Sequence, residues 1–195
     1  MTLKDGREYR AVQEFSLSQP EGEAPEYRVT GVAAVFNTPT LLFEADGVKY
    51  YEVIDSRAFE GCDLSDVIFN YNHGGKVVAR LRNKTLSLHI GERALEMAAD
   101  LSGTEAGRQL FEEIKGGYID KMSFSFTIRE QSYDSTTHTR TILKVKKLYD
   151  VSAVDIPAYN ETSISARGFF AGEHAKELAA LEQARRTRRL IALTY

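Results

Sequence analysis

The chain has 195 residues, of which 43% are hydrophobic and 27% charged, and its ten tyrosines and ten phenylalanines supply bulk for a core. This composition fits one domain and excludes a chain that is disordered throughout. No apolar run reaches the roughly 18 residues of a membrane span, and residues 1–10 lack the apolar stretch of a secretory signal, so we expect no membrane partner. The single cysteine, Cys62, excludes an internal disulfide and a cysteine-based zinc site and suits a reducing cytoplasm.

The net charge of −3 is unevenly distributed along the chain. Residues 172–195 carry five basic and three acidic residues, so this end is near +2 and the rest is near −5. A nucleic-acid binder that uses the cluster Arg185–Arg189 is disfavoured, because such domains usually carry a basic excess overall. The basic end is either an interaction arm or a solvated helix face.

The first part of the chain reads as strands. We expect a strand within residues 1–15, a mobile loop over about 16–26, where two of the four prolines lie, and a β-rich segment over 27–36. Residues 41–54 read as a hairpin, because Asp46-Gly47 is a strong signal for a two-residue turn.

Two further strand pairs and a helix follow. The first pair spans residues 67–81 around Gly74-Gly75, and the second spans 85–99. Ser102–Glu105 matches the S-x-x-E capping box, and Gly116-Gly117 supplies a stop, so the spacing predicts a helix between them. Its expected buried face consists of Ala106, Leu110, Phe111 and Ile114.

Residues 121–128 alternate strictly, which is typical of a strand. Met122, Phe124, Phe126 and Ile128 fall on one face, and Lys121, Ser123, Ser125 and Thr127 on the other. Strands over 139–156 and a helix over 175–193 complete the predicted order. Many strands with few helices indicate a β-rich α+β protein, either a bent β-barrel or a strongly bent sheet, with peripheral helices.

His73 is the first candidate for chemistry. It follows a predicted strand and precedes two glycines, which leave open backbone for a ligand, and the pKa of an ordinary histidine suits a general base. Taken alone, it is more often a histidine at a strand end without a catalytic role.

Ser123 is the second candidate. The apolar face of its strand would hold its hydroxyl rigidly at a surface, and a serine becomes nucleophilic only when a neighbouring base takes its proton. Without such a base it is a solvent-facing strand serine.

The segment from Leu148 to Tyr159 holds two carboxylates. Asp150 and Asp155 lie five positions apart and so point to opposite faces of a regular strand, and only one of them can orient a given imidazole. Each is otherwise a carboxylate at a strand edge or turn. His89, on another predicted strand, is a weaker candidate.

No sequence signature supports a cofactor or a metal. The chain has no H-x-x-x-H or H-E-x-x-H pair and no glycine-rich phosphate-binding loop, so we expect neither group.

Taken together, several segments resemble the prohead (capsid maturation) proteases of tailed bacteriophages. The strongest is residues 103–126, GTEAGRQLFEEIKGGYIDKMSFSF, which is similar to that family's helix and nucleophile strand. Asn72-His73 matches its N-H position, residues 149–159 (YDVSAVDIPAY) its segment (E/D)-V-S-x-V-x-x-P-A, and residues 29–37 an early block. The resemblance covers about residues 27–167 in the expected order.

The resemblance implies a serine endopeptidase with a fold similar to the herpesvirus assemblins. It assigns Ser123 as the nucleophile, His73 as the general base and Asp150, before V-S, as the third member, with Asp155 and His89 as alternatives. Two departures stand out: Ser125 replaces the family's usual glycine and would tighten the space beside the nucleophile, and Gly74 replaces an aspartate that often follows the histidine.

The resemblance also implies substrates among scaffold and capsid proteins, and the protease's own tail, inside an assembling prohead in the host cytoplasm. We expect a protease domain over residues 1–168, a basic helical tail over 169–195, and a homo-oligomer, a dimer. The rival interpretation is a non-catalytic β-barrel module for capsid assembly, which has the same core but no catalytic geometry.

Overall fold

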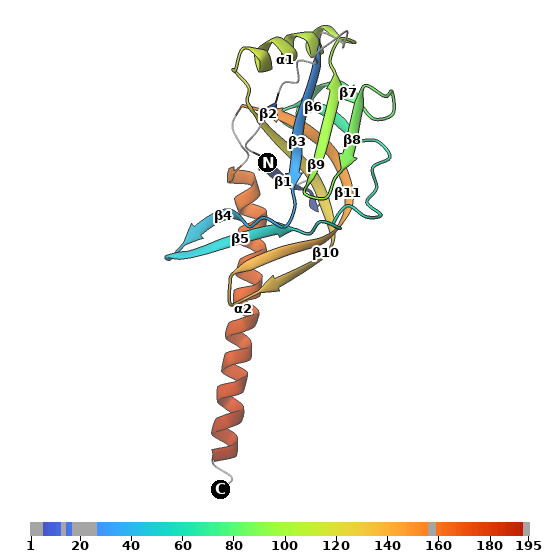
Figure 1. Cartoon of the computed structure of the whole chain (residues 1–195). Coiled ribbons are helices and arrows are strands. Elements are labelled where there is room, and N and C mark those ends of the chain that lie inside the picture. Colours follow the sequence, from blue (N-terminus) through green and yellow to red (C-terminus); the bar gives the residue numbers. More distant parts are fainter. Residues whose placement is uncertain (1–5, 13–14, 17–26, 156–158, 193–195) are drawn as a thin grey trace.

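The computed structural model describes residues 6–12, 15–16, 27–155 and 159–192 (Figure 1). Almost all of the predicted mobile loop over 16–26 lies outside these residues. The described strands are β1 (Glu8–Val12), β2 (Phe15–Ser16), β3 (Arg28–Val35), β4 (Thr40–Ala45), β5 (Val48–Ile54), β6 (Ile68–Tyr71), β7 (Gly74–Arg80), β8 (Leu86–Ile90), β9 (Ala94–Asp100), β10 (Lys121–Asp134) and β11 (Thr139–Val154). The described helices are α1 (Glu105–Lys115) and α2 (Tyr159–Ala192).

The strands form two sheets. The larger has the order β1-β10-β11-β5-β4, with β6 paired to β11 and β7 to β6, and the smaller has the order β2-β3-β9-β8. The β-rich α+β class predicted from the sequence is confirmed, but no closed barrel is found among the described strands.

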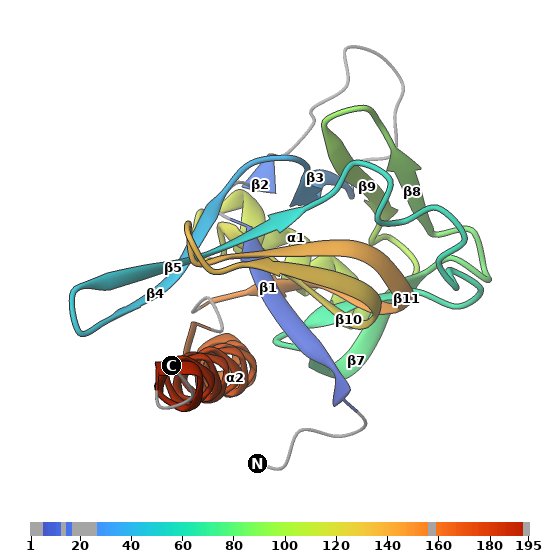
Figure 2. The same cartoon turned by 90° about the horizontal axis from the view of Figure 1, so that it is seen from below.

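The long strand β11 organises the larger sheet. Its first part pairs in parallel with β5 and its last part in parallel with β6, while β10 runs antiparallel beside it. Several register shifts interrupt the pairing of β10 with β11. Such bulges bend and twist a ladder, and both strands curve strongly (Figure 2).

The core lies between the two sheets and beneath α1. The apolar face of β10 supplies Met122, Phe124 and Phe126, each at most 1% exposed. The predicted apolar face of α1 is confirmed, because Leu110, Phe111 and Ile114 are buried and Ala106 packs against them.

Two details of α1 concern its ends. The predicted capping box at Ser102 is wrong: the N-cap is Thr104, whose Oγ1 accepts a hydrogen bond of 2.9 Å from the backbone N–H of Gly107. Ser102 lies in the preceding turn, where its N–H donates to Asp100. The predicted stop is confirmed, with Gly116 as the C-cap and Gly117 at a φ of +75°.

The helix α2 is longer than predicted, since it begins at Tyr159 rather than near residue 175. Phe170 is 3% exposed and packs against the rings of Phe43 and Tyr50, which fixes the helix beside the β4–β5 hairpin. Beyond that point α2 leaves the body as a rod, and Leu178 and Leu181 are exposed (Figure 1). The helix runs through residue 168, and the division into domains at that residue stays a prediction.

The fold of the segment between Thr40 and Ile54 follows from its turn residues. The β4–β5 hairpin turns at Asp46-Gly47, which adopt φ values of +52° and +77°, as a two-residue turn requires.

None of the described helices is both long enough and apolar enough to cross a membrane.

Candidate active site

His73 lies in the tight turn that joins β6 to β7. Tyr71 pairs with Gly74, so Asn72 and His73 are the two turn residues, and both have positive φ values of +50° and +54°. The sequence predicted the turn at Gly74-Gly75, and that placement is wrong because these glycines begin β7. A non-glycine residue with positive φ is uncommon, and such backbone tends to cluster at functional sites.

Four polar side chains share one face of the β10–β11 pair. Ser123 lies directly opposite Ser152, and Ser125 lies directly opposite Asp150. Side chains two positions apart on a strand point the same way, so the four form a compact block. Each serine is 0% exposed and Asp150 is 5% exposed.

The burial of Ser123 corrects the expectation of a solvent-facing hydroxyl. The alternation of β10 is as predicted, but its polar face is covered as well as its apolar one. β10 is an inner strand, with β1 on one side and β11 on the other, and the turn that carries His73 lies against its polar face.

The structure brings the three sequence-predicted residues together. His73 Nε2 lies 2.6 Å from Ser123 Oγ, although 50 residues separate them, and His73 Nδ1 lies 2.6 Å from Asp150 Oδ1. Tyr9 of β1 packs edge-on against the imidazole, with ring centroids 4.6 Å apart. A base within hydrogen-bond reach of a serine, itself held by a carboxylate, is the arrangement that nucleophilic acyl transfer needs.

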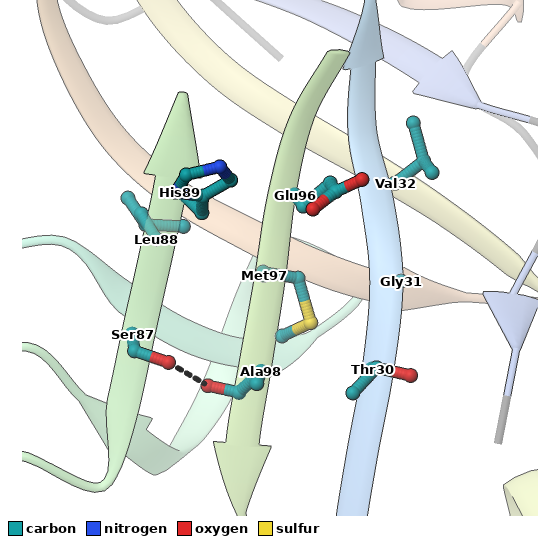
Figure 3. A pocket seen from close by; sticks show the side chains of 9 residues that line it. All are labelled: Thr30, Gly31, Val32, Ser87, Leu88, His89, Glu96, Met97 and Ala98. Atoms are coloured by element: carbon teal, nitrogen blue, oxygen red, sulfur yellow. Dashed lines mark hydrogen bonds between the residues drawn. The ribbon is translucent and has the colours of Figure 1, made fainter. Parts of the chain in front are cut away.

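The alternative third members lie elsewhere. Asp155 accepts a hydrogen bond of 2.7 Å from the Tyr71 hydroxyl. His89 is exposed on β8 in the smaller sheet, directly opposite Glu96. Figure 3 shows it among the side chains that line a pocket of about 410 Å³ on strands β3, β8 and β9.

Three polar residues around Asp150 were missed as parts of the site. The Ser125 hydroxyl donates to Asp150 Oδ2, and the Ser152 hydroxyl lies 3.0 Å from Asp150 Oδ1. Ser152 also donates to Asn70 Oδ1 on the neighbouring strand β6. The period of two in M-S-F-S-F and D-V-S places these serines on one face, but it does not say which strand lies beside which.

Cys62 is a poor nucleophile. Burial, and after it the adjacent carboxylate of Asp63, raise the pKa of its thiol to about 11. Little thiolate is therefore present at neutral pH.

Among the residues that the structure describes, no cluster of three or more histidine, cysteine, aspartate or glutamate side chains is suited to hold a metal ion.

Comparison with known proteins places the chain in a family. The family model of the caudovirus prohead serine proteases matches residues 13–177. No curated protein and no solved structure gives a significant match. The matched range covers most of the chain and contains the buried serine, the histidine in its turn and the aspartate on β11. The chain therefore belongs to the caudovirus prohead serine protease family.

Proposed function

We propose that the protein is a serine endopeptidase in which Ser123 is the nucleophile, His73 the general base and Asp150 the residue that orients the base. Membership of the family indicates a serine protease of capsid maturation. The observation that carries the residue assignment is the continuous line of two 2.6 Å contacts from Ser123 through His73 to Asp150.

In this mechanism Ser123 Oγ attacks the carbonyl carbon of a peptide bond while His73 Nε2 takes its proton. The C–N bond then breaks, and the protonated imidazole gives that proton to the leaving amine. Water attacks the resulting ester in the reverse sense and releases the serine. Asp150 accepts the Nδ1–H of His73, so it fixes the tautomer in which Nε2 is free to accept a proton, and it stabilises the imidazolium.

Ser123 is 0% exposed, whereas the side chain of His73 beside it keeps 12% of its surface exposed. β1 borders β10 here, and its Tyr9 contacts the ring of His73.

We further propose that the substrates are segments of scaffold and capsid proteins, cleaved in the assembling prohead in the host cytoplasm. The protease's own tail is a second proposed substrate, since α2 is exposed from Ala179 to Arg189. A dimer and a lack of nucleic-acid binding stay predictions, which light scattering and salt-dependent retention on DNA would test. A fold similar to the herpesvirus assemblins also stays a prediction.

Co-expression with the capsid and scaffold proteins of the same phage tests this proposal. We expect the wild-type chain to cleave them and Ser123→Ala to leave them intact. Because the lost hydroxyl is buried and hydrogen-bonded, the variant should lose only about 1 kcal/mol of stability and should still fold. Full cleavage by a folded Ser123→Ala protein would reject the proposal, and intact substrates with both proteins would favour the non-catalytic assembly module.

A further inference from the structure

Both oxygens of the Asp150 carboxylate have hydrogen-bond partners. Oδ1 faces His73 Nδ1, whereas Oδ2 accepts a hydrogen bond from the Ser125 hydroxyl. Ser125 lies on β10 directly opposite Asp150 and is fully buried, so solvent does not compete for this contact. The two oxygens therefore have different partners, His73 and Ser152 at Oδ1 and Ser125 at Oδ2.

From this geometry we infer that Ser125 is a positioning residue, which fixes the plane of the Asp150 carboxylate so that Oδ1 meets the imidazole of His73. The inference rests on the proposed function. The terminal torsion of an aspartate has a broad energy profile, so its carboxylate turns easily unless both oxygens are held. Ser125 removes that freedom.

Ser152 does not replace Ser125 in this role. Its hydroxyl has a single proton and two acceptors within reach, Asn70 Oδ1 and Asp150 Oδ1. It also touches the oxygen that His73 already uses. Among the described residues, Asp150 is the acceptor of the Ser125 hydroxyl, and Ser125 is the donor to Oδ2.

The backbone next to Ser125 supports this assignment. Ser125 pairs with Asp150, but the next residue of β10, Phe126, pairs with Leu148, so one residue of β11 is left over as a bulge. A bulge changes the direction of the side chains beside it and is common next to active sites. Here it adjoins the pair that holds the carboxylate. Ser125 thus has a hydrogen-bond partner rather than merely occupying space beside the nucleophile.

Ser125→Ala tests the inference against a matched control on the same strand. Thr127 lies two residues further along β10 and is 9% exposed, and its hydroxyl has no partner among the described residues. Thr127→Val therefore removes a buried hydroxyl without removing a hydrogen bond. The measurement is the rate of covalent modification of Ser123 by a fluorophosphonate probe, resolved into a maximal rate and a half-saturating concentration.

We expect Ser125→Ala to lower the maximal rate about 10- to 100-fold, as misplacement of a reacting group does, with the half-saturating concentration and the thermal midpoint little changed. Thr127→Val should match the wild type. The low-field proton resonance of the His73 Nδ1–H should move in Ser125→Ala and stay in place in Thr127→Val. A wild-type rate and an unmoved resonance in folded Ser125→Ala would overturn the inference.

Two further variants separate the possible failures. Ser125→Cys keeps the shape of the side chain and donates weakly, so its rate should fall between those of the wild type and Ser125→Ala. If Ser125→Ala does not fold, a wild-type rate in Ser125→Cys overturns the inference. If the probe does not modify Ser123 in the wild-type protein, the proposed function is rejected. If Ser125→Ala is modified at the wild-type rate while Ser123→Ala is not modified, only the positioning role of Ser125 is rejected.

Discussion

The imidazole of His73 and the carboxylate of Asp150 meet at 2.6 Å, although 77 residues separate them in the chain. The contact exists because β6 pairs in parallel with the last part of β11, so the turn after β6 lies over the face that carries Asp150. A two-residue turn with positive φ at both positions holds the ring there. Sheet pairing therefore sets the position of the proposed base relative to the proposed acid.

Replacing Asp150 by asparagine should lower the turnover rate about 10⁴-fold, because the amide favours the wrong imidazole tautomer. Asp155→Asn is the control, since that carboxylate pairs with Tyr71, and it should keep a rate within a few-fold of the wild type. The measurement is the rate of peptide cleavage, with circular dichroism to show that both variants fold. Equal rates for the two variants would exclude Asp150 as the orienting acid.

Gly31 of β3 allows the smaller sheet to approach β10 closely. A Cβ built at Gly31 would collide with the sulfur of Met122, which is fully buried and precedes Ser123. Gly31→Ala should therefore destabilise the protein by about 1–3 kcal/mol through overpacking. Gly103→Ala is the control, because a Cβ there meets no atom within 4 Å. Chemical denaturation measures both, and equal midpoints would show that the two sheets pack less tightly at this point than the structure indicates.

Alkylation should leave the peptidase intact. The pKa of Cys62 is raised to about 11 by burial, so little thiolate is present at pH 7, and the proposed chemistry does not use this residue. Cleavage rates after prolonged treatment with iodoacetamide should match those of untreated enzyme. If iodoacetamide inactivated the wild-type protein but not a Cys62→Ala variant, the thiol would have a role in cleavage that its position in the structure does not explain.

A buried ion-pair network ties β1 to the larger sheet and makes stability depend on pH. The carboxylate of Glu8 lies 2.7 Å from the guanidinium of Arg140 and 2.6 Å from that of Arg10. Arg10 also pairs with Glu52. Burial alone would raise the pKa of Glu8, but the two guanidinium groups outweigh it and hold the pKa below its ordinary value of 4.5. The stabilisation is therefore complete above about pH 4.5 and is lost as the pH falls toward the lowered value.

Glu8→Gln should lose about 3–5 kcal/mol of stability at neutral pH, because it leaves an excess of buried positive charge. Its free energy of unfolding should also fall less steeply than that of the wild type below pH 4.5. Urea titrations at several pH values measure both effects. Parallel curves for the two proteins over the acidic range would show that Glu8 does not titrate with a lowered pKa.

Many of the strands and the first helix could be predicted from local patterns in the sequence. Alternation placed β10, the Asp46-Gly47 signal placed the β4–β5 hairpin, and apolar spacing placed the buried face of α1. These features depend on near neighbours in the chain, which is why the sequence alone predicts them.

Features that depend on distant segments were not predictable in this way. Alternation separates the two faces of β10, but only the pairing with β1 and β11 and the turn over it make Ser123 buried. Glycine is the usual signal for a turn, so the turn formed by Asn72 and His73 was displaced by two residues in the prediction. The part of α2 before residue 175 was missed, and the packing of its Phe170 against Phe43 is tertiary rather than local.

Identification of the residue that a serine-directed probe modifies is the most direct test of the proposed active site. The wild-type protein should react with a fluorophosphonate, and tandem mass spectrometry should locate the adduct on Ser123. His73→Ala should react at least about 10³-fold more slowly, because the serine then has no base, and heat-denatured protein should not react. An adduct on Ser125, Ser152 or another residue, or a wild-type rate in folded His73→Ala, would contradict the assignment of Ser123 and His73.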